Sequence, residues 1–188
     1  MRWQRFAGFE SLGIAVNLSQ AELLRPELAG VVQEALAESG LAPGSLMLEI
    51  TESGAMADPA AALGALHGLR KLDVRLALDD FGTGHASLSH LRDFPIDILK
   101  IAKTFVDRLE RGPSDVTFVD AILRLASTLE LGVVAEGIER QEQAELLRRL
   151  ECGLGQGYHF ARPLAEADAE AHLAEAVGQH RRRRIRVA

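Results

Sequence analysis

The chain has one cysteine, Cys152, and its 188 residues contain no apolar run long enough to cross a bilayer. A lone cysteine excludes a disulfide framework within the chain, and the opening residues Met1 to Phe6 lack the apolar segment of a signal peptide. These absences favour a cytoplasmic location. Because the sequence supplies no cationic neighbour that would activate a thiolate, we expect Cys152 to be a buried residue at a helix end and not a nucleophile.

Positive charge is scarce outside the end of the chain. Five of the 21 lysines and arginines are tail arginines, at positions 181–184 and 186, which leaves 16 basic against 27 acidic residues. So acidic a body is a poor electrostatic match for a nucleic acid polymer. We expect one globular domain over residues 1–177 and a disordered basic tail over residues 178–188. Contact of this tail with nucleic acid or anionic lipid stays an alternative.

Short apolar runs alternate with longer segments of helical periodicity. This βα repeat predicts an α/β fold with a parallel sheet covered by helices. The predicted strands are Ile14–Leu18, Leu46–Ile50, Arg75–Asp79, Ile96–Ile101, Val133–Ala135 and Tyr158–Phe160. The predicted helices are Glu27–Ser39, Pro59–Leu72, Val116–Glu130, Gln141–Leu150 and Glu166–Val177.

Polar residues recur at the carboxyl ends of these strands. The set is Asn17, Glu49, Asp79 with Asp80, Lys100 and Glu136, and Gln156 precedes the last strand. In a (β/α)8 barrel all such strand ends meet at one mouth, where the active sites of that fold lie. We therefore interpret the set as a functional site, although any single member could instead be a helix cap or an outer partner.

Two adjacent carboxylates, those of Asp79 and Asp80, end one strand and are followed directly by Phe81-Gly82-Thr83-Gly84. Like charges this close repel, and a bound cation is the usual way to keep both ionised. Oxygen ligands of this kind suit magnesium, manganese or calcium. A solvated turn that caps the next helix is the alternative for this run taken alone.

The motifs together resemble those of the EAL domain, the phosphodiesterase of the bacterial second messenger cyclic di-GMP. The resemblance runs from about residue 3 to about residue 165, with the motifs in the same order. They are Asn17-Leu18-Ser19, Leu48-Glu49-Ile50-Thr51-Glu52, Asp79-Asp80-Phe81-Gly82-Thr83-Gly84, Leu99-Lys100-Ile101, Val134-Ala135-Glu136-Gly137-Ile138-Glu139, and Gln156-Gly157-Tyr158 with Arg162-Pro163.

The resemblance implies a TIM-barrel fold and a hydrolase that opens cyclic di-GMP to linear pGpG with Mg²⁺ or Mn²⁺, usually two ions. It implies a homodimer through the loop after Asp80. The implied metal ligands are Asn17, Glu49, Asp79, Asp80 and Glu136. Glu136 is alternatively the base that activates water, and Lys100 positions the nucleophile or offsets phosphate charge. The implied supporting or substrate-binding residues are Glu52, which steadies the loop after Asp80, with Glu139, Gln156 and Arg162.

Two departures from the family pattern bear on activity. No Glu-Ala-Leu motif precedes Asn17, and about six strands can be counted where a barrel has eight, so the expected barrel is incomplete by about its first two βα units. Ala102 stands where the family commonly has aspartate, in Lys-Ile-Asp. Loss of such an acid predicts metal binding or activity weaker by about 10–100-fold.

Other functions fit the same residues less well. A lysine at a strand end could form a Schiff base, but carboxylates around Lys100 should keep it protonated. Asp80-Phe81-Gly82 matches a protein-kinase motif without the other kinase motifs. The alternative that stays open is a catalytically inactive EAL module that binds cyclic di-GMP or a protein partner.

Overall fold

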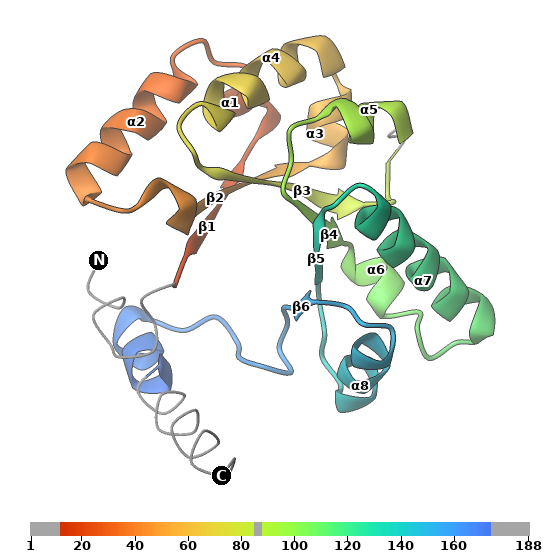
Figure 1. Ribbon diagram of the computed structural model, residues 1–188. Coiled ribbons are helices and arrows are strands. Elements are labelled where there is room, and N and C mark those ends of the chain that lie inside the picture. Colours follow the sequence, from red (N-terminus) through yellow and green to blue (C-terminus); the bar gives the residue numbers. More distant parts are fainter. Residues whose placement is uncertain (1–11, 85–87, 174–188) are drawn as a thin grey trace, which may run out of the picture.

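The strands form one parallel sheet in chain order. The computed structural model describes residues 12–84 and 88–173 (Figure 1). Each strand is hydrogen-bonded to the next, from β1 at one side to β6 at the other. The strands are β1 (Ile14–Leu18), β2 (Leu46–Thr51), β3 (Arg75–Phe81), β4 (Ile98–Ile101), β5 (Gly132–Ala135) and β6 (Leu154–Gly155). Parallel neighbours require a crossover, and the helices provide it.

The longer helices begin and end at residues typical of helix termini. Pro59 and Pro113 occupy the first helical position, where a missing N–H costs nothing, and Gly40 ends one helix with φ +65°. These helices are α2 (Leu28–Ser39), α4 (Pro59–Arg70), α7 (Pro113–Thr128) and α8 (Gln141–Arg149). Shorter ones are α1 (Gln20–Leu23), α3 (Glu52–Met56), α5 (Leu88–Asp93), α6 (Lys103–Val106) and the 3-10 turn η2 (Pro43–Ser45).

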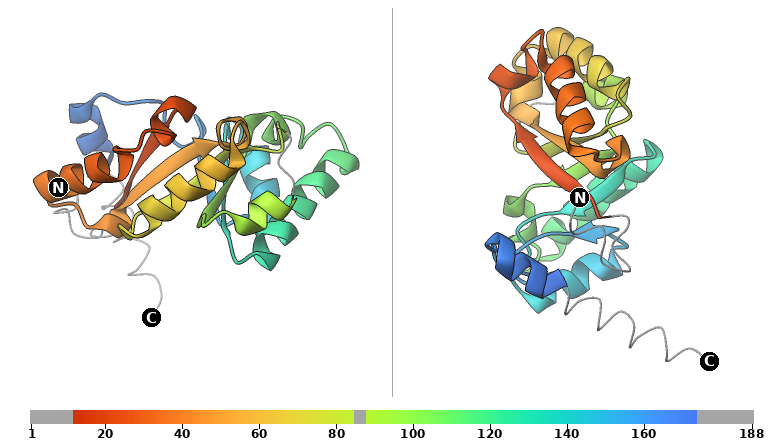
Figure 2. Two further views of the ribbon diagram at one scale, coloured as in Figure 1. Left: turned by 90° about the horizontal axis from the view of Figure 1, so that it is seen from above. Right: turned by 90° about the vertical axis from the view of Figure 1, so that its left-hand side faces the viewer.

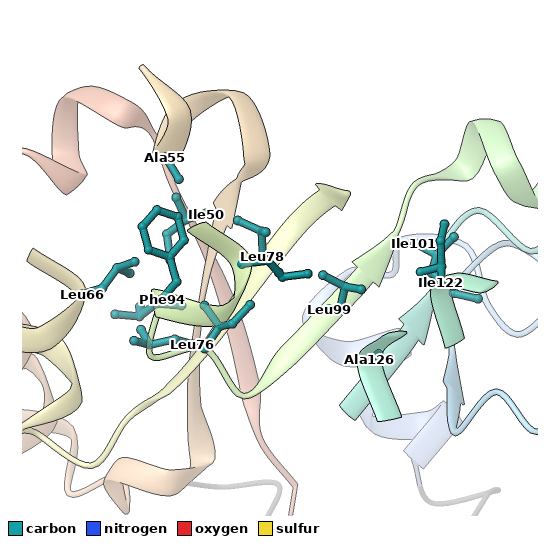
Figure 3. Packing of buried hydrophobic residues seen from close by; sticks show 14 of the residues in the cluster. Ile50, Ala55, Leu66, Leu76, Leu78, Phe94, Leu99, Ile101, Ile122 and Ala126 are labelled. Atoms are coloured by element: carbon teal, nitrogen blue, oxygen red, sulfur yellow. The ribbon is translucent and has the colours of Figure 1, made fainter. Parts of the chain in front are cut away.

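The main hydrophobic core lies between the helices and one face of the sheet. Figure 3 shows Ile50, Leu76 and Leu78 packed among side chains from the helical layer. Leu76, Leu78 and Leu99 are at most 1% exposed. Burial of each such side chain contributes about 1.5–3 kcal/mol to folding. The main hydrophobic core therefore fixes the positions of β2, β3 and β4.

A second, smaller apolar cluster lies on the opposite face of the sheet. Ala77, Ile98 and Val134 are its buried members, and the half-buried Met47 packs against them. Because side chains alternate between the two faces of a strand, the residues two positions further along each strand face the same side as this cluster.

The predicted fold class is confirmed, since the described residues contain six parallel strands of a curled, incomplete barrel with crossover helices (Figures 1 and 2). Five predicted strands and four predicted helices are present, with ends that differ by a few residues at most. The fifth predicted helix is described only over residues 166–173. None of the helices in the described ranges is both long enough and apolar enough to span a membrane. The basic tail lies outside the described residues.

The prediction of a strand at Tyr158–Phe160 is wrong. The last strand is β6, four residues earlier, and residues 158–160 form a turn in which the Phe160 amide donates to the Gly157 carbonyl. The turn is forced by a close approach, because a Cβ at Gly157 would overlap the backbone of Ile138. The alternation of aromatic residues therefore reflects a turn with exposed rings, since Tyr158 is 51% and Phe160 53% exposed.

Candidate active site at the carboxyl ends of the strands

A polar layer lies directly above the small apolar cluster. Met47, Ala77, Ile98 and Val134 are each followed, two residues later, by a charged residue that faces the same side. Those residues are Glu49, Asp79, Lys100 and Glu136. In the strand register Asn17 of β1 lies opposite Glu49 of β2, whereas Glu49 lies opposite Ala77 and Lys100 opposite Val134, each two residues before the next acid.

Lys100 is the centre of this layer. Its Nζ lies 2.6 Å from Glu49 Oε2, 2.6 Å from Glu136 Oε1 and 3.2 Å from Asp79 Oδ1. The ammonium is buried, as is Glu49, whereas Asp79 and Glu136 are partly open to solvent. Carboxylates from β2, from β3 and from the residue after β5 thus converge on one cation from β4, which joins these four parts of the sheet at one point.

The electrostatics of the layer are dominated by negative charge. Burial alone would lower the pKa of Lys100, but hydrogen bonds to Glu136 and Glu49 outweigh it and hold that pKa above its ordinary value. Burial raises the pKa of Glu136, and the nearby Asp79 adds to this, while Lys100 opposes it. Lys100 is therefore protonated at neutral pH, which argues against a Schiff-base lysine.

Asp79, Asp80 and Glu136 form an acidic cluster at the open side of the layer. One carboxylate oxygen from each lies within 4.8 Å of the others. Consecutive strand residues normally face opposite sides, but the register between β3 and β4 shifts between Leu78 and Phe81, and Asp80 has φ +55°. The left-handed residue brings both carboxylates to one side, and the Asp80 amide donates to Asp79 Oδ1 at 2.9 Å.

The loop after Asp80 is held by a buried carboxylate. Glu52, only 1% exposed, accepts hydrogen bonds from the amides of Gly82 at 2.7 Å and Gly84 at 3.3 Å. A Cβ at Gly84 would lie 2.7 Å from Glu52 Oε1, so a larger residue there would displace this carboxylate. The loop that follows the paired aspartates is therefore fixed from α3, although residues 85–87 lie outside the described part.

The remaining predicted site residues lie around the polar layer and not within it. Glu139 pairs with Lys103, whose Nζ is 2.8 Å from Glu139 Oε1. Gln156 is exposed and is bound through its backbone, which donates to Ala135 and accepts from Ile138. The guanidinium of Arg162 stacks over the Tyr158 ring at 4.7 Å from its centroid.

Two residues that hold this region were not among those predicted from the sequence. Gln143 of α8 is fully buried and accepts hydrogen bonds from the amides of Glu139 and Arg140. A glutamine three residues after a helix cap is a recognisable signal of such a bond. Lys103 carries no comparable signal, because its partners are 36 residues away or lie on its own exposed face.

The donor chemistry fits a hard divalent cation. Four carboxylates, from Glu49, Asp79, Asp80 and Glu136, face a single ammonium, so the layer has an excess of negative charge that a cation would offset. All of the available ligand atoms in the acidic cluster are oxygens, which suit Mg²⁺, Mn²⁺ or Ca²⁺.

The chain is similar in sequence to members of one known protein family. A sequence model of the EAL domain matches residues 1–163. The chain is 41% identical over 92% of its length to the cyclic di-GMP phosphodiesterase NbdA of Pseudomonas aeruginosa, and 38% identical over 84% to the cyclic di-GMP phosphodiesterase RocR of the same organism. It spans 22% and 40% of these two proteins.

Solved structures match with similar strength. The EAL domain of DcpA from Mycobacterium smegmatis superimposes with a TM-score of 0.86 at 35% identity, over 93% of this chain and 78% of that one. The MucR phosphodiesterase in complex with c-di-GMP superimposes with a TM-score of 0.82 at 40% identity, over 86% of this chain and 66% of that one.

Replacement of Lys100 should destabilise the chain strongly. Lys100→Met keeps most of the side-chain volume but leaves three converging carboxylates without their cation, which we expect to lower the free energy of unfolding by about 3–5 kcal/mol. Urea denaturation at neutral pH with a chelator present measures this. Arg124→Met is the control, because its exposed pair with Asp120 is worth about 0–1 kcal/mol. Equal effects of the two changes would contradict the central role of Lys100.

Glu136→Gln should change how stability depends on pH. Because the pKa of Glu136 is raised in the folded state, the folded chain binds more protons than the unfolded one, and stability falls as pH rises from the unfolded pKa of about 4.3 through the folded value. The glutamine variant lacks this loss. In the presence of a chelator we expect it to be more stable than the parent at pH 7 but not at pH 4. A less stable variant at pH 7 would refute the raised pKa.

Proposed function

Because the chain belongs to the EAL domain family, we propose that it carries the site of a phosphodiesterase that hydrolyses cyclic di-GMP to linear pGpG. The observation that carries this proposal is the acidic cluster of Asp79, Asp80 and Glu136 beside the buried Lys100 at the carboxyl ends of the strands. The proposed substrate is taken from relatives, because NbdA and RocR are named cyclic di-GMP phosphodiesterases and the MucR structure is a complex with c-di-GMP.

The proposed cofactors are two Mg²⁺ or Mn²⁺ ions. Their ligands would be Asn17, Glu49, Asp79, Asp80 and Glu136. Divalent cations, when bound, lower the pKa of water and offset charge on a phosphate group. Asn17 is included because an asparagine side-chain oxygen is a common ligand of hard divalent cations. The strand register also places Asn17 opposite Glu49.

The protein groups have separate tasks in the proposed reaction. A water oxygen bonds to phosphorus, one ester oxygen leaves, and the water proton needs an acceptor. Glu136 is the proposed acceptor where it is not itself a metal ligand, because burial raises its pKa in the metal-free chain and makes it a better proton acceptor than an ordinary glutamate. Lys100 stays protonated, so its ammonium supplies a fixed positive charge beneath the phosphate.

Residues around the layer are proposed to support it. Glu52 holds the loop after Asp80, and we propose that this loop also forms a homodimer contact. Glu139 is proposed to steady the segment after Glu136. Gln156 and Arg162 are exposed and are proposed to support the site or to contact substrate. The domain is proposed to extend over residues 1–177, with 178–188 as a separate basic tail.

Turnover by the purified chain tests the proposal. We expect incubation with cyclic di-GMP and Mn²⁺ to yield pGpG, quantified by chromatography. Asp79→Asn keeps the side-chain shape but removes a charge, and it should reduce the rate by more than the roughly 10–100-fold cost of losing an outer partner of a metal site. Asp120→Asn is the control, because Asp120 lies on α7 and pairs only with an exposed arginine in the described part of the chain.

The experiment has three outcomes, which distinguish a phosphodiesterase, a cyclic di-GMP receptor and a protein that is neither. Product that persists in Asp120→Asn and disappears in Asp79→Asn supports a phosphodiesterase. Saturable binding of cyclic di-GMP without product would overturn the catalytic proposal in favour of a receptor. Neither product nor binding would contradict both.

Ala102 offers a gain-of-function prediction. It precedes α6 as a buried N-cap residue with φ −57° and ψ 144°, and no side-chain hydrogen bond caps the helix. Ala102→Asp supplies both a favoured capping residue and another acid next to Lys100. We expect Mn²⁺ to bind about 10-fold more tightly in titration calorimetry. Unchanged affinity in a variant that remains folded would show that this position does not influence the site.

A further inference from the structure

Within the described residues few polar side chains are buried, and they hold the strand-end layer or the segments that follow it. In the described ranges the buried polar or charged residues are Glu49, Glu52, Lys100 and Gln143. The first three lie in the layer or hold the loop after Asp80. Gln143 belongs to α8 and holds a different segment, the one that follows Glu136.

The segment over residues 136–139 has no regular structure of its own. Its first residue, Glu136, lies one position beyond β5 and donates its amide hydrogen to the Ile101 carbonyl at 3.0 Å. Gly137 then takes φ +68°, which favours glycine. The placement of the Glu136 carboxylate, 2.6 Å from Lys100, therefore depends on how this irregular segment is held from outside the sheet.

Lys103 covers the segment with its aliphatic stem. A Cβ at Gly137 would overlap the Cβ, Cγ and Cδ atoms of Lys103, so the stem lies directly on the glycine backbone. The Nζ atom then reaches Glu139 Oε1 at 2.8 Å and Asp107 Oδ1 at 3.1 Å. One side chain thus contacts the segment at two points, two residues apart.

Two further contacts join the end of this segment and the adjacent Arg140 to α6 and to the residues that follow it. Gln143, which binds the amides of Glu139 and Arg140, donates its amide hydrogen to the Val106 carbonyl at 3.4 Å. Arg140 forms an ion pair with Glu110 at 2.6 Å. The segment that begins at Glu136 is therefore attached to residues that follow Lys100 in the chain.

We infer that Lys103 is a positioning residue of the strand-end site, which sets the Glu136 carboxylate against Lys100 by holding the segment 136–139; the consequence for metal binding rests on the proposed function. Only Ile101 and Ala102 separate Lys103 from Lys100 in the chain. The residue that supports the Glu136 segment is thus attached to the strand that carries the partner of Glu136. A displacement of α6 would move both together.

Because the Lys103 ion pair is exposed, its effect on the position of segment 136–139 can be separated from an effect on the stability of the whole fold. The side chains of Lys103 and Glu139 are 48% and 44% exposed, and pairs this open to solvent contribute little to overall stability. A change at Lys103 should therefore loosen the segment without lowering the melting temperature appreciably. If Lys103 had a merely structural role, its replacement could loosen the segment but would leave Mn²⁺ affinity unchanged.

The test compares Lys103→Ala, Lys103→Met and the parent chain by two measurements, with the melting temperature recorded for each variant. Amide hydrogen exchange of Ile138, Glu139 and Arg140 in the metal-free protein reports on the segment, and Mn²⁺ titration calorimetry reports on the site. We expect Lys103→Ala to exchange faster and to bind Mn²⁺ about 10-fold more weakly. Lys103→Met keeps the stem over Gly137 and should lose less. Arg124→Ala removes another exposed ion pair, on α7, and should change neither quantity.

Each outcome decides the inference. Faster exchange with weaker Mn²⁺ binding supports it, provided that the melting temperature is retained. Unchanged exchange overturns it, and faster exchange with parental Mn²⁺ affinity reduces Lys103 to a structural contact and also overturns it. Absence of Mn²⁺ binding by the parent chain would contradict the proposed function, while the exchange comparison would still decide whether Lys103 holds the segment.

Discussion

One buried ammonium, that of Lys100, determines how the strand ends of this sheet are arranged. Carboxylates from β2, β3 and the residue after β5 converge on it, and none of them could be buried so closely without a cation between them. The apolar layer of Met47, Ala77, Ile98 and Val134 beneath excludes water from one side and so strengthens these interactions. The remaining acidic groups are left with an excess of negative charge on the open side, where a substrate and its cations would approach.

Much of the fold follows from short-range signals in the sequence. Apolar runs and helical periodicity locate five strands and four helices, and the alternation of strand faces explains why the polar strand-end residues Glu49, Asp79, Lys100 and Glu136 meet. The wrong strand at Tyr158–Phe160 shows the limit of that rule. Two alternating aromatic residues cannot indicate a turn that depends on the backbone of Ile138, which is distant in sequence and touches Gly157.

Other features depend on contacts that no local pattern encodes. Lys103 looks like an ordinary surface lysine in the sequence, and its packing against Gly137 exists only because α6 and the end of β5 are neighbours in space. The family resemblance implies a supporting role for Glu139, and the structure pairs its side chain with this lysine. The sequence identifies Ala102 as a departure from the family pattern. Only the structure shows that Ala102 is buried and that no side chain caps the helix that follows it.

The left-handed residue at the end of β3 has a consequence for the kinds of sequence change that this site tolerates. Strict alternation would send one of two consecutive aspartates to the helix-covered side, where Leu76 and Leu78 fill the core. The register shift and the φ of Asp80 remove that conflict. Deletion of one residue at this turn would restore strict alternation and place a carboxylate among the apolar side chains of the main core. Length is thus as strictly constrained at this turn as residue identity, and related sequences should vary in the side chains around it before they vary in spacing.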